Sequence, residues 1–505
     1  MDPLVFLVGG VALLTYALHG FNGMLSRDLA VYSYAGQQVA EGVPPYLGIL
    51  NRAGPLAHVI PGIGVGIARI GGFDDVLTMR LLFMVIATAC VCAVYVLGRD
   101  VFASKLAGLV TSAAFLTFFG FIEYASNGPR EKTPMTLFIT VALWAVARRR
   151  WFTAGLFVSL ATLCLQIAFF SSFAAVLAGV LFLAHGERLK ALLRVAVGGA
   201  VPVAVLMVWF AIAGSLRASV DAFVLINFRY TTPDPVLPVL DEAWLDVTTA
   251  YGVSLWVLIA GLVALPLLSL GVLRKATRLA NPWLPVVAAF TVGAAVGLAW
   301  NFKEYDAWPD LFPMLPLAAV GLGGVFHVAT KRLPVRATLV AAVALSLVAT
   351  VLAIHHSVTS RGDRLETQRA SVKAVLAQLP DDATITSVEA PQALVLDKRR
   401  NPTRHQMFSS GLQFYIDDIW PGGLEGFRRD LVADAPDMIV FGDPVSDRWR
   451  AAIEPEYVYV GSAPDWFWYA RRSLGEEKLA ELRKAAGYDP DDEWARPPPP
   501  EPLPE

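Results

Sequence analysis

The sequence is dominated by apolar blocks close to twenty residues long, separated by short polar loops. About 20 apolar residues suffice for a helix to cross the hydrocarbon core of a bilayer. Only 17% of the 505 residues are charged, against roughly 25% in globular proteins. The pattern predicts a mostly α, multi-pass membrane protein with about eleven spans: 4–20, 78–97, 105–122, 132–147, 152–167, 169–185, 195–213, 251–273, 283–300, 310–329 and 336–354.

Loop charge supports this count and gives an orientation. Cytoplasmic loops are expected to carry the Lys and Arg residues. With the N-terminus inside, every predicted inner loop is short and basic, as in Arg148-Arg149-Arg150, and most acids fall outside. A miscount of the two spans that meet near Gln166 would reverse every later loop. We expect a cell-membrane protein whose polar functional groups gather on the outer face. The net charge of −2 indicates no nucleic-acid partner.

The composition changes after residue 355. Residues 356–487 contain polar helical patterns that alternate with apolar, β-branched runs, such as 383–388, 438–441 and 457–460. This alternation is typical of a small α/β domain, which the loop parity places outside the membrane. Residues 488–505 are acidic and rich in Pro, so they cannot bury a core and are expected to be disordered. The predicted organisation is therefore a membrane domain (1–355), an extracytoplasmic α/β domain and a tail.

The loop that follows the first span carries an acid, Asp28, beside a base, Arg27. Irregular backbone is not tolerated against lipid, so the stretch 28–61 must lie at the membrane surface or line a cavity. An ionisable residue at the end of a span indicates a functional site. The structural alternative is that Asp28 only caps a helix that starts at Leu29.

Three other outer segments carry groups that could do chemistry: 123–132, with Glu123, Arg130, Glu131 and Lys132; 303–308, with Lys303, Glu304, Tyr305 and Asp306; and 214–250, with Arg229. Each has a structural alternative. The charges of the first could anchor a helix as an ion pair, the aromatic residues of the second could form an interfacial belt, and the third could be a surface helix.

The motifs of soluble enzymes are absent from the sequence: there is no P-loop, no zinc-binding spacing of Cys and His, and no G-x-S-x-G. The three cysteines, Cys90, Cys92 and Cys164, lie in apolar blocks and are expected to pack as small hydrophobic residues.

The order of spans and polar loops along the chain resembles that of the GT-C superfamily of membrane glycosyltransferases, in particular the protein O-mannosyltransferases and the bacterial lipid A aminoarabinose transferase. The resemblance covers most of the chain, and no single motif is diagnostic alone. Its carriers are Arg27-Asp28, Gly36-Gln37, Glu41-Gly42-Val43-Pro44-Pro45-Tyr46, Gly54-Pro55-Leu56, Met79-Arg80-Leu81, 129–134 (PREKTP), 155–166, and 311–316 (LFPMLP).

The resemblance implies a sugar transfer on the outer face, from a polyprenyl-phosphate donor to an acceptor hydroxyl on a glycan, lipid or protein. The first-loop acid of the family corresponds to Asp28, and its second-loop acid to Glu123 or Glu131. The chain departs from the family at Cys164-Leu165-Gln166, where many members have a Lys near the end of the fifth span.

The chemistry of such a transfer suggests roles for the other polar residues. Phosphate is a good leaving group, so one carboxylate, for which we choose Asp28, can serve as the general base. Asp28 and a second acid could hold a Mg²⁺ or Mn²⁺ ion, although the sequence requires none. Cations must neutralise the departing phosphate; the candidates are Arg27, Arg130, Lys132, Arg229 and Lys303, and Tyr46, Glu304, Tyr305 and Asp306 are assigned to the substrate cavity.

Two other functions fit an apolar chain of this kind. A transporter or flippase of a lipid-linked or anionic solute would carry charged or helix-breaking residues at mid-span, but the charges here lie in loops. A membrane-anchored binding protein could use Trp466, Phe467 and Trp468 as a contact patch. The position of these three residues in a strand-like run favours a core or membrane-facing role instead.

Overall fold

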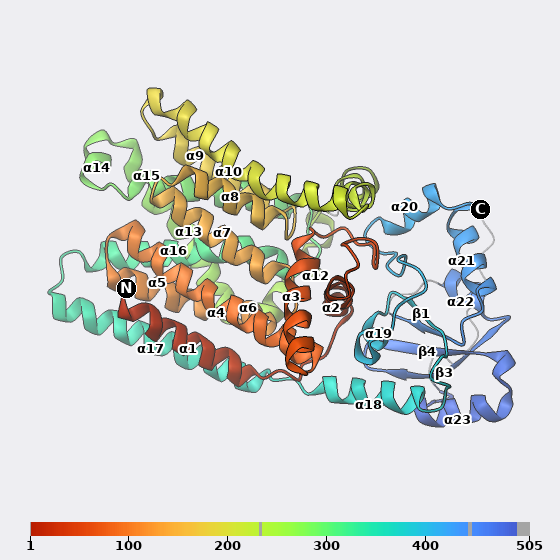
Figure 1. The fold of residues 1–505 in the computed structure, drawn as a ribbon. Coiled ribbons are helices and arrows are strands. Elements are labelled where there is room, and N and C mark those ends of the chain that lie inside the picture. The colour runs from red at the N-terminus through yellow and green to blue at the C-terminus, as the bar shows by residue number, and fades with distance from the viewer. Residues whose placement is uncertain (1, 232–234, 443–446, 492–505) are drawn as a thin grey trace.

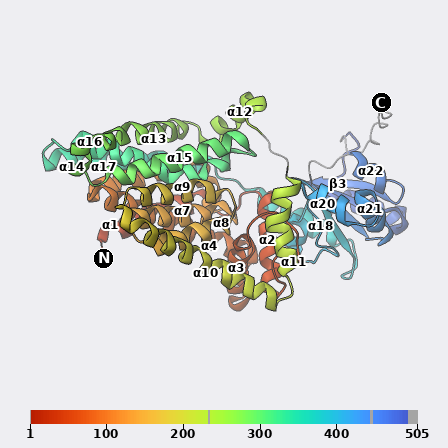
Figure 2. The same ribbon diagram turned by 90° about the horizontal axis from the view of Figure 1, so that it is seen from above.

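The computed structural model describes residues 2–231, 235–442 and 447–491. A bundle of helices forms one end of the molecule, and a small sheet domain forms the other end (Figure 1). Two helices, α2 (Arg27–Ala40) and α3 (Leu56–Gly71), lie between the bundle and the sheet domain in both views (Figures 1 and 2). The mostly helical membrane domain and the small α/β domain agree with the sequence prediction.

By length and composition, six helical segments in the described residues can cross a membrane. They are α4 (Asp75–Phe102), α10 (His185–Ile212), α13 (Ser254–Ser269) with η3 (Leu270–Leu273), α15 (Leu284–Lys303), η4 (Trp308–Met314) with α16 (Leu315–Thr330), and α17 (Val335–Thr359).

Other apolar helices of the bundle are shorter or bent. Helices α5 (Lys105–Leu116) and α6 (Phe119–Ala125) form a pair bent by 75°, where the sequence predicted one span over 105–122. The shorter apolar helices are α1 (Pro3–His19), α3, α7 (Lys132–Ala147), α8 (Trp151–Thr162) and α9 (Ala168–Leu181). The total of about eleven spans stays a prediction.

Further helical segments connect the bundle helices. They are α11 (Leu216–Val220), η1 (Asp221–Tyr230, a π-helix), η2 (Leu237–Val239), α12 (Leu240–Tyr251) and α14 (Lys275–Ala280).

Ion pairs gather several of the predicted inner loops at one end of the bundle. Asp2 lies 3.5 Å from Arg99 and 3.4 Å from Lys105, and Asp100 lies 3.9 Å from Arg148. The structure therefore groups these loops as the loop parity predicted. Which side of the membrane they occupy stays a prediction.

The sheet domain has four strands in the order β1 (Ile385–Val388), β2 (Met438–Phe441), β4 (Trp466–Arg471) and β3 (Tyr457–Ala463). Strands β1 and β2 are parallel, whereas β4 is antiparallel to both β2 and β3. Helices α18 (Arg364–Leu376), α19 (Gln392–Asp397), α20 (Leu412–Ile419), α21 (Gly423–Ala433), α22 (Asp447–Ile453), η5 (Arg472–Leu474) and α23 (Glu476–Ala486) complete the domain.

Helix α2 shares a hydrophobic core with the sheet domain. Leu29 and Tyr34 of α2 are buried in the same cluster as Trp466 and Trp468 of β4. The two tryptophans are 1% and 0% exposed, so they serve the core and are not available as a contact patch. This shared core fixes the helix that carries Asp28 against the sheet domain. Residues 492–505 of the predicted tail lie outside the described residues, and the domain boundaries stay predictions.

Candidate functional site

A cavity of about 660 Å³ lies where the bundle, helix α2 and the sheet domain meet. Its wall includes apolar side chains, namely Val31, Leu165, Ile167, Phe170, Phe228 and Trp300. It also carries five basic and five acidic side chains: Arg27, Arg52, Arg130, Lys132 and Lys303 with Asp28, Glu131, Glu304, Asp306 and Asp310. A wall that combines both kinds of group suits an amphiphile with a charged head and an apolar tail.

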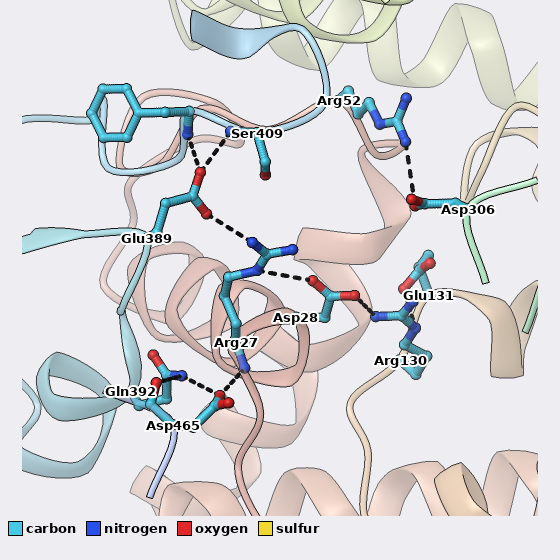
Figure 3. Close-up of polar contacts among 11 residues, drawn as sticks. Arg27, Asp28, Arg52, Arg130, Glu131, Asp306, Glu389, Gln392, Ser409 and Asp465 are labelled. Carbon is cyan, nitrogen blue, oxygen red and sulfur yellow. Dashed lines mark hydrogen bonds and ion pairs between the residues drawn. The ribbon is translucent and has the colours of Figure 1, made fainter. Parts of the chain in front are cut away.

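Asp28 lies in the first turn of α2 and faces this cavity. Ser26 is the residue that precedes the helix, so the structural alternative, in which Asp28 caps a helix from Leu29, is wrong. The Asp28 carboxylate accepts from the Arg130 guanidinium and lies 3.7 Å from Arg27 (Figure 3). The Arg130 charge outweighs burial and lowers the pKa of Asp28 to about 2. The group is therefore ionised at neutral pH, and its side chain keeps 45% of its surface exposed toward the cavity.

The segment that begins α7 supplies Arg130, Glu131 and Lys132. Arg130 Nε lies 3.4 Å from the buried Glu131 carboxylate, and its guanidinium lies over the ring of Tyr124. Burial lowers the pKa of Arg130, but Glu131 and Asp28 outweigh that effect and raise it above its ordinary value. The Asp28–Arg130–Glu131 chain thus holds one cation between two carboxylates at the cavity wall (Figure 3).

Arg52 reaches across the cavity from the loop that precedes α3. Its guanidinium lies 3.9 Å from Glu304 and 3.6 Å from Asp306, distances typical of loose ion pairs. The backbone carbonyl of Arg52, in contrast, is held firmly by the amide of Gln166 at 2.9 Å and that of Asn227 at 3.0 Å. The backbone of the loop is therefore fixed, while the Arg52 guanidinium makes loose ion pairs.

The same loop leaves no space for a side chain at Gly54. A Cβ atom there would lie 2.0 Å from the carbonyl oxygen of Leu163, and the Gly54 N–H donates to the carbonyl of Cys164 at 3.0 Å. Residues 164–166, where many members of the resembling family have a Lys, thus serve in part to anchor the loop that carries Arg52.

Lys303, at the end of α15, lies 4.8 Å from the ring centroid of Trp300. Among the described residues it is the cavity cation without a carboxylate within 4 Å, since Arg27, Arg52, Arg130 and Lys132 each have one. Its charge is therefore available to an anion. The Trp300 ring also stacks on Phe170 at 3.8 Å, which places this cation beside the apolar wall.

Eight of the predicted site residues line the cavity together: Arg27, Asp28, Arg130, Glu131, Lys132, Lys303, Glu304 and Asp306. The other four do not line it. Tyr46 is buried and donates to the Ala53 carbonyl, Tyr305 donates to Asp246, and Arg229 pairs with Asp418 at 3.2 Å. Glu123 lines a second cavity of about 260 Å³ and lies 2.9 Å from His356.

Sequence reasoning missed three residues of this region. Asp310 pairs with Lys132 at 2.6 Å, Arg52 crosses the cavity, and Glu389 of the sheet domain pairs with Arg27 at 3.3 Å. A lone acid at the start of an apolar block was the signal for Asp310, since such a residue requires a partner. The sequence carries no local signal for Glu389, because its contact spans more than 360 residues.

Among the described residues, no group of three or more His, Cys, Asp or Glu side chains is placed to hold a metal ion. Arg130 occupies the space between Asp28 and Glu131 where a cation would bind. The present arrangement of these acids therefore does not fit a divalent ion, and a Mg²⁺ or Mn²⁺ ion enters no step below.

No model of a known protein family matches the sequence, and no curated protein matches it either. Solved structures do match. ArnT of Cupriavidus metallidurans bound to undecaprenyl phosphate superposes with a TM-score of 0.62 at 12% identity, over 93% of this chain and 98% of that one. Its apo form gives a TM-score of 0.58 at 11% identity, over 96% and 99% of the two chains.

The apo oligosaccharyltransferase of Archaeoglobus fulgidus is also similar. It superposes with a TM-score of 0.51 at 14% identity, over 96% of this chain and 78% of that one. ArnT is an aminoarabinose transferase, and both proteins belong to the superfamily that the sequence resembles. The chain has the fold of the GT-C membrane glycosyltransferases.

Proposed function

We propose that the protein is a membrane glycosyltransferase that moves a sugar from a polyprenyl-phosphate donor to an acceptor hydroxyl at the outer face of the membrane. The observation that carries this proposal is the position of Asp28. Its ionised carboxylate faces a cavity that contains an accessible cation, Lys303, beside an apolar wall. The ligand of the ArnT complex, undecaprenyl phosphate, combines an anionic head with an apolar tail.

The donor would place its phosphate near Lys303 and Arg52 and its isoprenoid chain along Phe170 and Trp300. In the transfer, the bond between the anomeric carbon and the phosphate oxygen breaks, and the phosphate leaves with the electron pair. The acceptor oxygen bonds to the same carbon as its proton passes to Asp28. Lys303 and Arg52 neutralise the charge that develops on the leaving phosphate.

The pKa of Asp28 distinguishes a base from an acid. A group with a pKa of about 2 holds no proton at neutral pH, so Asp28 can act as a base and not as an acid, and the ion pair with Arg130 that lowers this pKa also weakens it as a base. Glu131 keeps Arg130 in place at the opposite end of its guanidinium from Asp28.

Substitution of Asp28 by Asn tests the proposal. A positioned general base contributes about a hundredfold to ten-thousandfold in rate, so D28N should lower transfer by that factor. Membranes supplied with labelled polyprenyl-phosphate mannose, arabinose or glucose give the readout, and the same assay identifies the sugar. Asp381→Asn, an exposed acid of the sheet domain, is the matched control. Unchanged transfer by D28N would remove Asp28 from this role.

A further inference from the structure

Glu389 directly follows strand β1 and has a left-handed backbone, with φ of +60°. Such a conformation is uncommon outside glycine, so the surrounding contacts must maintain it. One carboxylate oxygen accepts from the backbone N–H groups of Phe408 and Ser409, both at 2.6 Å. The side chain is 5% exposed. Glu389 thus fixes the start of the segment 407–412, which consists of a loop and the first residue of α20 and is called the loop 407–412 below (Figure 3).

The other carboxylate oxygen of Glu389 lies 3.3 Å from the Arg27 guanidinium, at the first residue of α2. A second contact joins the same two parts of the chain. The Arg27 backbone N–H donates to Asp465 at 2.8 Å, and Asp465 also accepts from Gln392 at 2.7 Å (Figure 3). The sheet domain therefore holds the start of the helix that carries Asp28.

The loop held by Glu389 forms part of the cavity wall, through Met407, Ser409, Ser410 and Leu412. These residues bring hydroxyl and apolar groups but no charge. A phosphate requires cations, which lie on other elements of the cavity wall: α2, the loop before α3, the start of α7 and α15. An uncharged, hydroxyl-bearing wall suits an acceptor that is recognised by hydrogen bonds.

We propose that Glu389 is a positioning residue that fixes the loop 407–412, as the acceptor side of the cavity, against the helix that carries Asp28. This inference rests on the proposed function. One carboxylate sets two distances: its first oxygen places the loop, and its second places Arg27. Carboxylate–amide bonds are roughly twice as strong as neutral hydrogen bonds, so Glu389 is well suited to hold two backbone N–H groups.

The test uses the full chain in detergent with Glu389→Ala, Glu389→Gln and a control, Glu481→Gln, whose exposed side chain pairs with Lys478. In E389A the N–H groups of Phe408 and Ser409 lose their acceptor, so their hydrogen exchange should become faster. A displacement of about 1 Å in an active site can cost about a hundredfold; we therefore expect kcat/KM for the acceptor to fall about ten- to a hundredfold. The affinity for undecaprenyl phosphate should stay within about threefold of the original protein, since its proposed ligands are untouched.

E389Q separates the two contacts, because the Gln oxygen still accepts from both N–H groups while its amide cannot pair with Arg27. We expect E389Q to keep slow exchange in the loop and to show an acceptor kcat/KM between those of E389A and the original protein, since it keeps the loop contact and loses the contact with Arg27. If E389A does not fold, Ser409→Leu obstructs the same wall and should raise the acceptor KM without changing donor affinity. Slow exchange in E389A, or equal losses for donor and acceptor, would overturn the inference. If the original protein transfers no sugar, the proposed function fails, whereas the exchange measurement still decides whether Glu389 holds the loop.

Discussion

Lys132 Nζ lies 2.6 Å from Asp310 Oδ1, and the two side chains are 5% and 10% exposed. Lys132 begins α7, and Asp310 lies in η4. The other Asp310 oxygen accepts from the backbone N–H of Asp306 at 2.9 Å. This ion pair therefore joins two bundle segments and holds the loop that carries the acidic partners of Arg52.

Substitution of Lys132 by Met should destabilise the protein, because it leaves the Asp310 carboxylate buried without a cation. Removal of one partner of a buried pair costs about 3–5 kcal/mol. The double variant with Asp310→Asn should recover much of that loss, since no unpaired charge remains. Thermal unfolding in detergent gives the comparison. Lys478→Met breaks an exposed pair with Glu481 and should cost less than about 1 kcal/mol; an equal loss in both single variants would contradict the prediction.

Arg52 should contribute to donor binding and not to stability. Its ion pairs with Glu304 and Asp306 are long and partly exposed, and such pairs contribute roughly 0–1 kcal/mol. We expect Arg52→Gln to raise the KM for the lipid-linked donor about tenfold, as for the loss of one charge-assisted contact, with little change in the melting temperature. Arg148→Gln is the control, because Arg148 follows α7 at the end of that helix remote from the cavity residue Lys132. A lowered melting temperature with an unchanged KM would show that Arg52 is structural.

The sequence predicted the fold class and most of the charged cavity because both depend on local signals. Apolar blocks define helices, and the run 438–441 became β2 with those bounds. Polar loops at span ends located Asp28 and Glu131. Local sequence signals do not predict where a side chain lies when its position depends on distant segments of the chain. Glu123 and Arg229 carry the same kind of charge as the cavity residues, yet each turns to a partner that sequence spacing does not reveal, His356 and Asp418.

The pH dependence of transfer should report the Arg130 charge. Arg130 is the largest cause of the low pKa of Asp28, and burial acts in the opposite direction. In Arg130→Gln the pKa of Asp28 should therefore rise, and the base should become protonated at a higher pH. Activity that requires the ionised base is lost as the pH falls through its pKa. Because the pKa of Asp28 is about 2 in the original protein, its kcat/KM profile should be flat on the acid side between about pH 4 and about pH 8, whereas the R130Q profile should fall toward the acid end of that range.

Arg130→Lys is the matched variant for that experiment, because it keeps the positive charge beside Asp28 while it loses the guanidinium geometry. Its overall rate should fall, since Lys cannot contact Asp28 and Glu131 in the same way. The acid side of its profile should stay close to that of the original protein. Profiles of the same shape in R130Q and R130K would show that the Arg130 charge does not set the pKa of Asp28.

The two candidates for the second acid can be distinguished by matched Glu→Gln substitutions. Glu131 is buried beside Arg130 at the cavity, so Glu131→Gln should loosen the guanidinium that Asp28 contacts and lower kcat about tenfold or more. Glu123 lies in the other cavity against His356, whose ring stacks on Phe119 at 4.0 Å. Glu123→Gln should therefore leave transfer within about threefold, since Glu123 does not line the cavity that contains Asp28. Initial rates at saturating donor make the comparison, and a larger loss in E123Q than in E131Q would assign the second acid to Glu123.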